Sequence, residues 1–168
     1  MSISNFDAQF YIERKHIAAL LHDVHDPEIP GVSIIDLGMV IDVRRENDQW
    51  VIDLAPTYSG CPAIDVIPLL TKSHLAVMGY RDVAVGMIIH PPWSTDWMSE
   101  TGKQKLHDYG IAPPEGATGR VREAGKPKVC PQCGSTSHEL ISNYGATACK
   151  AIYRCNDCLE TFDYFKCY

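Results

Sequence analysis

Four of the seven cysteines stand in two pairs whose spacing suits a metal ion. Cys130 and Cys133 form one C-x-x-C pair, Cys155 and Cys158 form the other, and twenty-one residues separate the two pairs. A tight turn of this kind presents two sulfurs from one knuckle, and two knuckles supply the four thiolates of a tetrahedral zinc site. The sequence therefore predicts structural zinc at these four residues. A mononuclear iron or an iron–sulfur cluster on the same sulfurs stays open, because spacing alone does not separate these metals.

The two pairs lie in a C-terminal segment, residues 127–168, that is predicted to be a small β-rich zinc ribbon. Short strands are expected at 140–141, 151–153 and 162–165. A unit of about 40 residues buries too little apolar surface to fold on its own core, so it needs the metal. Two more cysteines, Cys149 and Cys167, could pack in the ribbon, pair with each other or belong to a partner's metal site.

The remaining cysteine, Cys61, lies in a turn that runs from Tyr58 to Pro62. Pro62 suits the first position of a helix, because its missing N–H has no partner there in any case. Cys61 would then be the helix N-cap and would face unpaired N–H groups and the positive end of the helix dipole. A thiol in that position loses its proton more readily, and the thiolate is both a nucleophile and a metal ligand. The alternative is a buried, unreactive cysteine that packs as a small apolar side chain.

Three strands and three helices are expected to position Cys61. Alternating residues predict strands over 39–43 and 50–55, joined as a hairpin, and a third strand over 83–89. Apolar residues at helical spacing predict helices from Ser4 or Asn5 to about residue 24, over 62–78, and from Ser94 or Thr95 to Gly110. The fold class is therefore α/β (α+β), a small three-stranded sheet with packed helices followed by the ribbon.

The helix over 62–78 carries the most detailed packing prediction. Pro68 lies inside it, so this proline either kinks the helix or marks an irregular first turn. The buried stripe is expected to comprise Ile64, Ile67, Leu70, His74 and Val77.

The segment 111–126 differs in composition from what precedes and follows it. Prolines and glycines punctuate it and apolar residues are sparse. Such a composition is typical of a linker. We therefore predict a first domain over residues 1–110, a linker over 111–126 and the ribbon over 127–168.

Length and composition exclude several classes of protein. The chain has 168 residues, of which 45% are hydrophobic and 21% charged, so a globular protein is expected. Its net charge of −6 provides no electrostatic surface for general nucleic-acid binding. No apolar run is long enough to span a membrane, and the N-terminus lacks the pattern of a signal peptide. A cytoplasmic location follows as an expectation, and reduced cysteines in that compartment favour metal binding over disulfides.

A loop with two carboxylates and an imidazole follows the first predicted helix. It contains His25, Asp26 and Glu28 between prolines and a glycine. On chemistry alone, an ordinary Asx turn with solvated charges explains this loop.

Several motifs together resemble a known family. They are Asp26-Pro27-Glu28-Ile29-Pro30, Asp36-Leu37-Gly38-Met39-Val40, the turn Pro56 to Pro62, and Pro91-Pro92-Trp93. Over residues 10 to 110 the chain is similar to the SufT-like iron–sulfur assembly domains. The whole chain resembles the D-type subunits of the bacterial phenylacetyl-CoA epoxidase system, through Trp93-Ser94-Thr95-Asp96-Trp97, Gly145-Ala146-Thr147-Ala148-Cys149-Lys150 and the ribbon cysteines.

The resemblance implies a non-catalytic accessory subunit of phenylacetate degradation that assists assembly or maintenance of an iron or iron–sulfur centre. It makes Cys61 a transient ligand for iron or a cluster, with Asp26 and Glu28 as candidates to lie beside it. The implied partners are the oxygenase and reductase subunits of the epoxidase system and the iron–sulfur assembly machinery. A homodimer is also open, and neither a nucleic acid nor a membrane is expected as a partner.

Two other functions compete with this one. The protein could be a purely structural interaction subunit of the oxygenase complex, with no metal transfer. It could instead be an enzyme with Cys61 as nucleophile. No sequence feature supplies a substrate pocket or an oxyanion hole for the enzyme, so a non-enzymatic function is predicted.

Overall fold

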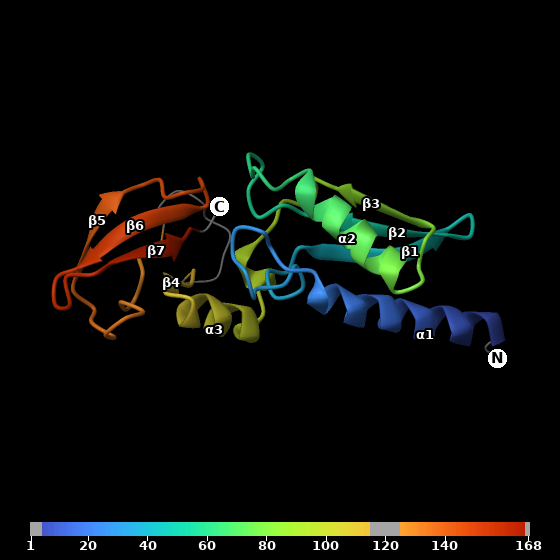
Figure 1. Cartoon of the computed structure of the whole chain (residues 1–168), viewed down its shortest axis with the longest axis horizontal. Coiled ribbons are helices and arrows are strands. Elements are labelled where there is room, and N and C mark those ends of the chain that lie inside the picture. The colour runs from blue at the N-terminus through green and yellow to red at the C-terminus, as the bar shows by residue number, and fades with distance from the viewer. Residues whose placement is uncertain (1–4, 115–124, 167–168) are drawn as a thin grey trace.

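The computed structural model describes residues 5–114 and 125–166. The ribbon sheet lies at one end of the molecule, the first sheet with α1 and α2 lies at the other, and α3 lies between them (Figure 1). Cys167 and most of the predicted linker fall outside the described residues. Among the described residues, no helix combines the length and apolar character that crossing a bilayer requires.

The first sheet has the predicted three strands. Strands β1 (Val40–Glu46) and β2 (Gln49–Leu54) form an antiparallel hairpin, and β3 (Val83–Met87) lies parallel to β2. The order is β1-β2-β3, and α2 (Val66–Val77) makes the crossover from β2 to β3. Two parallel strands need such a crossover between them. The Cys61 turn lies in this crossover, after the end of the central strand β2.

The first helix also follows the prediction. Helix α1 (Asn5–Leu20) runs into the short 3₁₀ helix η1 (Leu21–Asp23). Its expected apolar residues Ile17, Leu21 and Val24 are all buried. Near the start of the helix, Phe10 stacks on Trp50 of β2 with ring centroids 5.5 Å apart. These contacts hold α1 against the hairpin.

The prediction for α2 was wrong in two respects. The helix begins at Val66 instead of residue 62, and residues 62–65 form a turn. Pro68 therefore lies in the first helical turn, where a proline costs no hydrogen bond. The buried face is Ile67, Thr71 and Leu75, whereas the exposed fractions of Leu70 and Val77 are 41% and 82%. Leu70 and Val77, which the predicted stripe placed in the core, therefore lie on the surface.

The single helix predicted from Ser94 or Thr95 to Gly110 is two helices. They are η2 (Thr95–Trp97), capped by the Ser94 side chain, and α3 (Glu100–Asp108), capped by the Ser99 side chain. Met98 breaks the run, because its extended backbone turns its side chain into the core, where it is 4% exposed. Gly110 follows α3 with a φ of +82°, which is the predicted C-terminal stop.

A buried carboxylate ties α3 to the loop before β1. Asp36 accepts hydrogen bonds from the backbone and side chain of Ser33, from Ser99 Oγ and from Lys105 Nζ, the last at 2.6 Å. Burial alone would raise the pKa of Asp36, but the hydrogen bond from Lys105 and those from Ser33 hold this pKa below its ordinary value. Asp36 is therefore a charged side chain with a structural role, and it is not a candidate for proton transfer.

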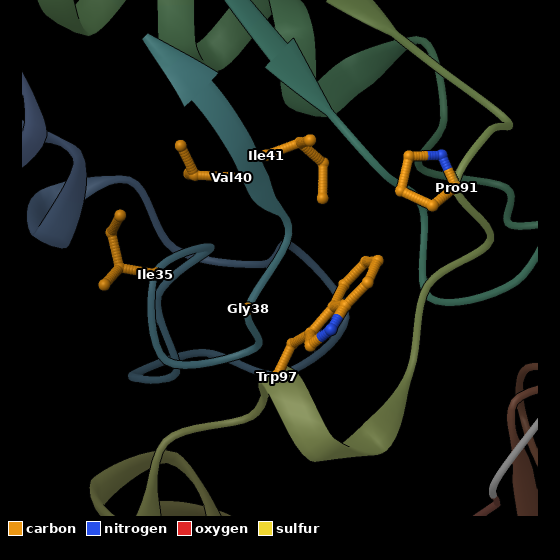
Figure 2. Close-up of a pocket in the computed structure, with 6 residues that line it drawn as sticks. All are labelled: Ile35, Gly38, Val40, Ile41, Pro91 and Trp97. Atoms are coloured by element: carbon orange, nitrogen blue, oxygen red, sulfur yellow. The ribbon is translucent and has the colours of Figure 1, made fainter. Parts of the chain in front are cut away.

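A surface pocket of about 410 Å³ opens beside this loop (Figure 2). Its lining residues are Ile35, Gly38, Val40, Ile41, Pro91 and Trp97. None of these side chains titrates or ligates metal, so this pocket is not the candidate site.

The second sheet contains the three strands predicted for the ribbon and one more. Strands β5 (His138–Ser142), β6 (Lys150–Cys155) and β7 (Thr161–Phe165) are antiparallel neighbours. Strand β4 (Ile111–Ala112) pairs in parallel with β7, and the order is β4-β7-β6-β5. Ile111 and Ala112 were predicted to belong to the linker, but they are part of the ribbon's sheet. A strand of two residues is too short to show an alternating pattern in the sequence.

The two units share a buried cluster of side chains. Ile111, Cys149 and Phe165 belong to the same core as Trp93 and the first sheet. The rings of Trp93 and Phe165 meet edge to face with centroids 6.2 Å apart, and Trp93 Nε1 donates to the Leu37 carbonyl at 2.8 Å. The ribbon thus packs on the first unit close to the Cys61 turn.

Candidate zinc centre and metal-handling site

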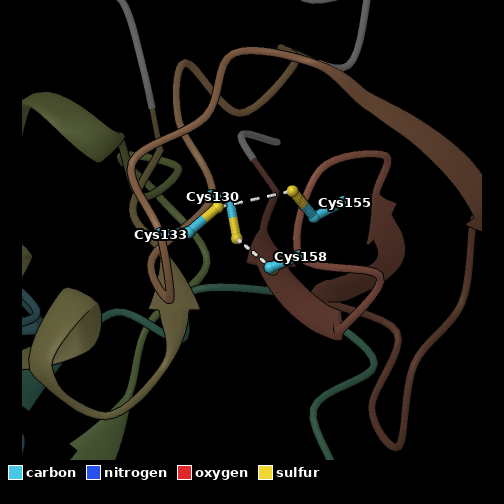
Figure 3. A group of neighbouring side chains, drawn as sticks. All are labelled: Cys130, Cys133, Cys155 and Cys158. Carbon is cyan, nitrogen blue, oxygen red and sulfur yellow. Dashed lines mark hydrogen bonds between the residues drawn. The ribbon is translucent and has the colours of Figure 1, made fainter.

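The four paired cysteines point toward one another from two loops (Figure 3). All four Sγ atoms lie within 4.8 Å of one another. The distance is 3.8 Å between the sulfurs of Cys130 and Cys158 and 3.6 Å between those of Cys133 and Cys155. A tetrahedral zinc ion with Zn–S bonds near 2.3 Å sets its sulfurs about 3.8 Å apart. The arrangement therefore fits a zinc ion with four thiolate ligands.

Backbone hydrogen bonds shape the two knuckles. Gly134 N donates to Cys130 O at 2.8 Å and Cys155 N donates to Glu160 O at 2.9 Å. Gly134 has a φ of +76° and Leu159 a φ of +66°, so each knuckle closes through a left-handed residue. The backbone N–H groups of Cys158 and Asp157 donate to the sulfur of Cys155 and lower its pKa to about 6. The pKa values of the neighbouring Cys133 and Cys158 thiols shift upward in the same group, so the sulfurs titrate as a set.

Cys61 lies at the end of the turn after β2, but not at a helix N-cap. Cys61 N donates to Tyr58 O and Ile64 N donates to Cys61 O, both at 3.1 Å, so the chain turns on both sides of it. The N-cap of α2 is Asp65. Burial raises the pKa of the Cys61 thiol, and the hydrogen bond from Ala63 N offsets this only in part. The predicted helix-dipole activation is therefore wrong, because the dipole begins four residues further on.

The raised pKa gives a testable pH dependence. The pKa of the Cys61 thiol lies above that of an ordinary cysteine, because the side chain is partly buried. The uncharged thiol is then the main form of Cys61 at neutral pH. In the zinc-loaded protein, the rate of Cys61 alkylation by iodoacetamide should rise about tenfold from pH 7 to pH 8 and keep rising past pH 9. Mass spectrometry of the Cys61 peptide measures this rate, with free cysteine as the control. A plateau below pH 8 would show a lowered pKa instead.

The loop with two carboxylates lies beside Cys61. Charges on Asp26 and Glu28 both raise the pKa of the Cys61 thiol, so the loop and the turn are neighbours in space. The Asp26 Oδ1 accepts a hydrogen bond from Glu28 N at 2.8 Å, which confirms the Asx turn. Asp26 is nevertheless 7% exposed, so the expectation of solvated charges was wrong for this residue, and burial raises its pKa. Glu28 and His25 remain exposed.

Sequence reasoning missed Cys149 as a neighbour of this site. Its side chain is 9% exposed and belongs to the core of the first unit, against which Cys61 also packs. A charge on Cys149 also acts on Cys61. Cys149 therefore packs where the ribbon meets the first unit. Cys167, its partner in another alternative, lies outside the described residues. The one signal in the sequence was that Cys149 belongs to neither C-x-x-C pair.

The site therefore combines groups from separate segments of the chain. Cys61 comes from the turn after β2, Asp26 and Glu28 from the loop after η1, and Cys149 from the segment before β6. Sulfur and carboxylate oxygen are both ligands that iron accepts in proteins. A half-buried thiol with a buried carboxylate beside it can hold an iron ion or a cluster without enclosing it.

Two family profiles match the chain. Residues 14–86 match iron–sulfur cluster assembly proteins, and residues 114–166 match the PaaD zinc β-ribbon domain. In solved structures, a domain of unknown function (DUF59) from Bacillus anthracis is similar, with 32% identity and a TM-score of 0.55. That similarity covers 59% of this chain and 95% of the other.

Curated relatives agree with both profiles. An Fe–S protein maturation auxiliary factor, YitW, of Bacillus subtilis (strain 168) is 36% identical over 95 residues, which is 55% of this chain and 92% of that protein. The D-type subunit of a putative 1,2-phenylacetyl-CoA epoxidase of Escherichia coli (strain K12) is 45% identical over 152 residues, which is 90% of this chain and 91% of that protein. The chain therefore belongs to the PaaD family, the D-type subunits of phenylacetyl-CoA epoxidase, and within it an iron–sulfur cluster assembly domain is followed by a zinc β-ribbon.

Proposed function

We propose that this protein is a non-catalytic accessory subunit of a phenylacetyl-CoA epoxidase system, and that it assists assembly or maintenance of an iron or iron–sulfur centre in its partners. The family supports the accessory role. The observation that carries the metal-handling role is the half-buried Cys61 with Asp26 and Glu28 beside it. The iron or cluster is cargo, whereas zinc in the ribbon is a resident structural ion.

The chemistry of Cys61 favours holding over catalysis. A nucleophilic cysteine at neutral pH needs a base or a lowered pKa, and burial raises the pKa of this thiol. Its charged neighbours are carboxylates, which repel a thiolate but attract a metal cation. Four enclosing ligands would retain a cluster, so a single accessible thiolate suits a ligand that must let go. The site thus suits uptake and release of iron.

The client is a subunit of the epoxidase system that contains a metal centre. The candidates are the oxygenase subunit and the reductase subunit, and the iron–sulfur assembly machinery would supply the cargo. The ribbon would dock the client while Cys61 holds the metal. A homodimer remains compatible with this role.

Coexpression tests the proposal. The epoxidase subunits are produced with the wild-type protein, with Cys61→Ala or with Ser59→Ala, and the iron and sulfide contents of each purified client are measured. We expect Cys61→Ala to cost about 1 kcal/mol of stability or less, since it removes one half-buried sulfur, yet to leave a client without most of its iron. Ser59→Ala, an exposed change in the same turn, should leave client maturation unchanged.

The alternative function predicts another pattern. If the protein only stabilises the oxygenase complex, Cys61→Ala will give clients with normal iron, and only changes in the ribbon will disrupt the complex. That result would contradict metal handling at Cys61.

A further inference from the structure

Helix α2 carries a second apolar face, on the side that does not pack on the sheet. The side chains of Val66, Leu69, Leu70 and Val77 are between 41% and 82% exposed there. Among the described elements, no other labelled helix or strand covers this side of α2 (Figure 1). A helix that is apolar on two sides is typical of one that is buried on two sides. The exposed residues therefore mark a contact surface for a partner.

The exposed residues follow the spacing of a helix–helix contact. Val66, Leu70, Ser73 and Val77 are separated by four, three and four residues, which places them in one row along about 16 Å of the helix. Leu69 lies at the edge of this row. Ser73 is small and exposed, so it leaves room for a larger side chain from a partner. We call these five residues the outer face of α2.

A groove follows one edge of the outer face. A pocket of about 360 Å³ is lined by Leu70 and Val77 of α2 and, from η1 and the loop after it, by Asp23, Val24 and His25. The groove therefore has apolar side chains along α2 and a carboxylate on its other wall.

The outer face and its groove adjoin the metal-handling site. Val66, at one end of the face, follows Cys61 by five residues, and His25 in the groove is followed directly by Asp26. A partner that lies along α2 is thus held beside the turn and the loop that supply the proposed ligands.

Acidic side chains border the outer face. Asp23 lines the groove and Asp65 is the N-cap of α2; both are exposed, and neither forms an ion pair with another described residue. Lys72, the one lysine or arginine in α2, lies on the edge away from the groove. This border favours a partner with lysine or arginine along the edge that meets the groove, and it disfavours an anionic membrane surface.

The size of the outer face distinguishes a transient partner from a stable second copy. A stable complex buries about 800 Å² of each partner, from about 20–30 residues a side. The outer face and the groove together provide far fewer residues, so this surface alone is too small for a stable dimer. It suits a partner that docks and leaves, and a client that receives metal is such a partner.

We propose that the outer face of α2 docks an amphipathic helix of the client subunit, with apolar residues at the same spacing and lysine or arginine along the edge that meets Asp23. This inference rests on the proposed function and adds a docking surface on the first unit to the one in the ribbon. The docked helix holds the client beside Cys61 during transfer, and the small contact area lets it dissociate afterwards.

Binding measurements with the zinc-loaded full chain test the inference. Biolayer interferometry compares the affinities of wild type and two double variants for the purified oxygenase and reductase subunits. The α2 double variant combines Leu69→Ser with Val77→Ser, and the α1 control combines Tyr11→Ser with Ile12→Ser, two residues that are also more than half exposed on a helix. We expect the α2 double variant to bind one of the subunits at least about tenfold more weakly, and the α1 control to bind within about twofold of wild type.

The charge of the groove is tested in the same assay. Asp23→Lys should weaken binding at least about threefold, and this loss should shrink as the salt concentration rises. Asp48→Lys is the matched control, because Asp48 lies in the turn between β1 and β2 with its side chain 90% exposed. It should leave the affinity unchanged. Tighter binding by Asp23→Lys would overturn the assignment of a basic edge to the partner.

The outcomes separate the inference from the proposed function. Normal binding by the α2 double variant, or no binding by wild type, would overturn the inference. Equal losses in both double variants would also overturn it, because the loss would then not be specific to α2. A wild-type dimer in sedimentation that the α2 double variant lacks would assign the face to a second copy instead. Normal client iron with Cys61→Ala would contradict the proposed function and leave the docking site standing.

A measurement on wild type guards against variants that do not fold. Hydroxyl-radical footprinting labels exposed side chains, and mass spectrometry measures the labelling rate of each peptide with and without the client. The client should slow labelling of Leu69, Leu70 and Val77 and leave that of Ile12 unchanged. Equal labelling of α2 in the free protein and in the complex would contradict docking at this face.

Discussion

Replacing Cys130 with serine is expected to abolish zinc binding and to unfold the ribbon. Cys130 is fully buried, and its sulfur lies 3.8 Å from that of Cys158 in the group of four. Structural zinc contributes apparent folding free energies of about 10–16 kcal/mol in small zinc domains. The ribbon's own core is the single cluster around Tyr153, Phe162 and Tyr164, which is too small to replace that contribution.

Zinc analysis and circular dichroism measure this effect. Wild type should carry one zinc per chain and lose its ribbon strands when a chelator removes the ion. Glu160→Gln, an exposed change beside the second knuckle, should keep the zinc and the fold. The first sheet is expected to stay folded but to unfold at a lower temperature, because Trp93 loses its contact with Phe165. A ribbon that keeps its strands without metal would show that the zinc is not structural.

Replacing Gly102 with alanine is expected to destabilise the first unit by about 2–4 kcal/mol. Gly102 lies in α3, where alanine would ordinarily stabilise a helix by about 1 kcal/mol. A Cβ at this position would lie 2.5 Å from the Asp36 carbonyl oxygen, a contact that forces the backbone to move. The same carbonyl accepts a hydrogen bond from Ser99 N, so moving α3 away also loosens its N-terminus.

A second glycine supplies the matched control. At Gly86 in β3, no atom lies within 4 Å of the position that a Cβ would take. Gly86→Ala should therefore change the free energy of unfolding by less than about 1 kcal/mol. Urea unfolding of both variants measures the difference. A Gly102→Ala protein as stable as wild type would mean that α3 does not pack closely on the loop before β1.

Patterns that are local in the chain predicted most of the fold. The C-x-x-C pairs, the alternation of β6 and β7 and the hairpin from Val40 to Leu54 each depend on neighbouring residues, and each is confirmed. The predicted start of α2 was wrong because Pro62 and Pro68 both suit a first helical turn. In the structure the first turn is the one that contains Pro68, and the sequence pattern alone does not distinguish the two prolines. A strand as short as β4 carries no pattern at all.

The candidate site shows the same limit. The resemblance made Asp26 and Glu28 candidates to lie beside Cys61, and charges on both act on the Cys61 thiol. The position of Cys149 could not be predicted from the sequence, because it depends on how the ribbon packs on the first unit. That packing is a contact between residues far apart in the sequence. The pKa of Cys61 was predicted in the wrong direction for a related reason, since burial outweighs the local backbone and burial is a property of the whole fold.

Transfer of iron between purified proteins tests the central claim most directly. The zinc-loaded protein is charged anaerobically with iron, or with iron and sulfide, freed of excess metal and mixed with client subunits that lack their metal. We predict that wild type will restore iron to the oxygenase or the reductase subunit and that Cys61→Ala, with its zinc intact, will not. Equal restoration by both proteins would contradict the claim that Cys61 holds the cargo.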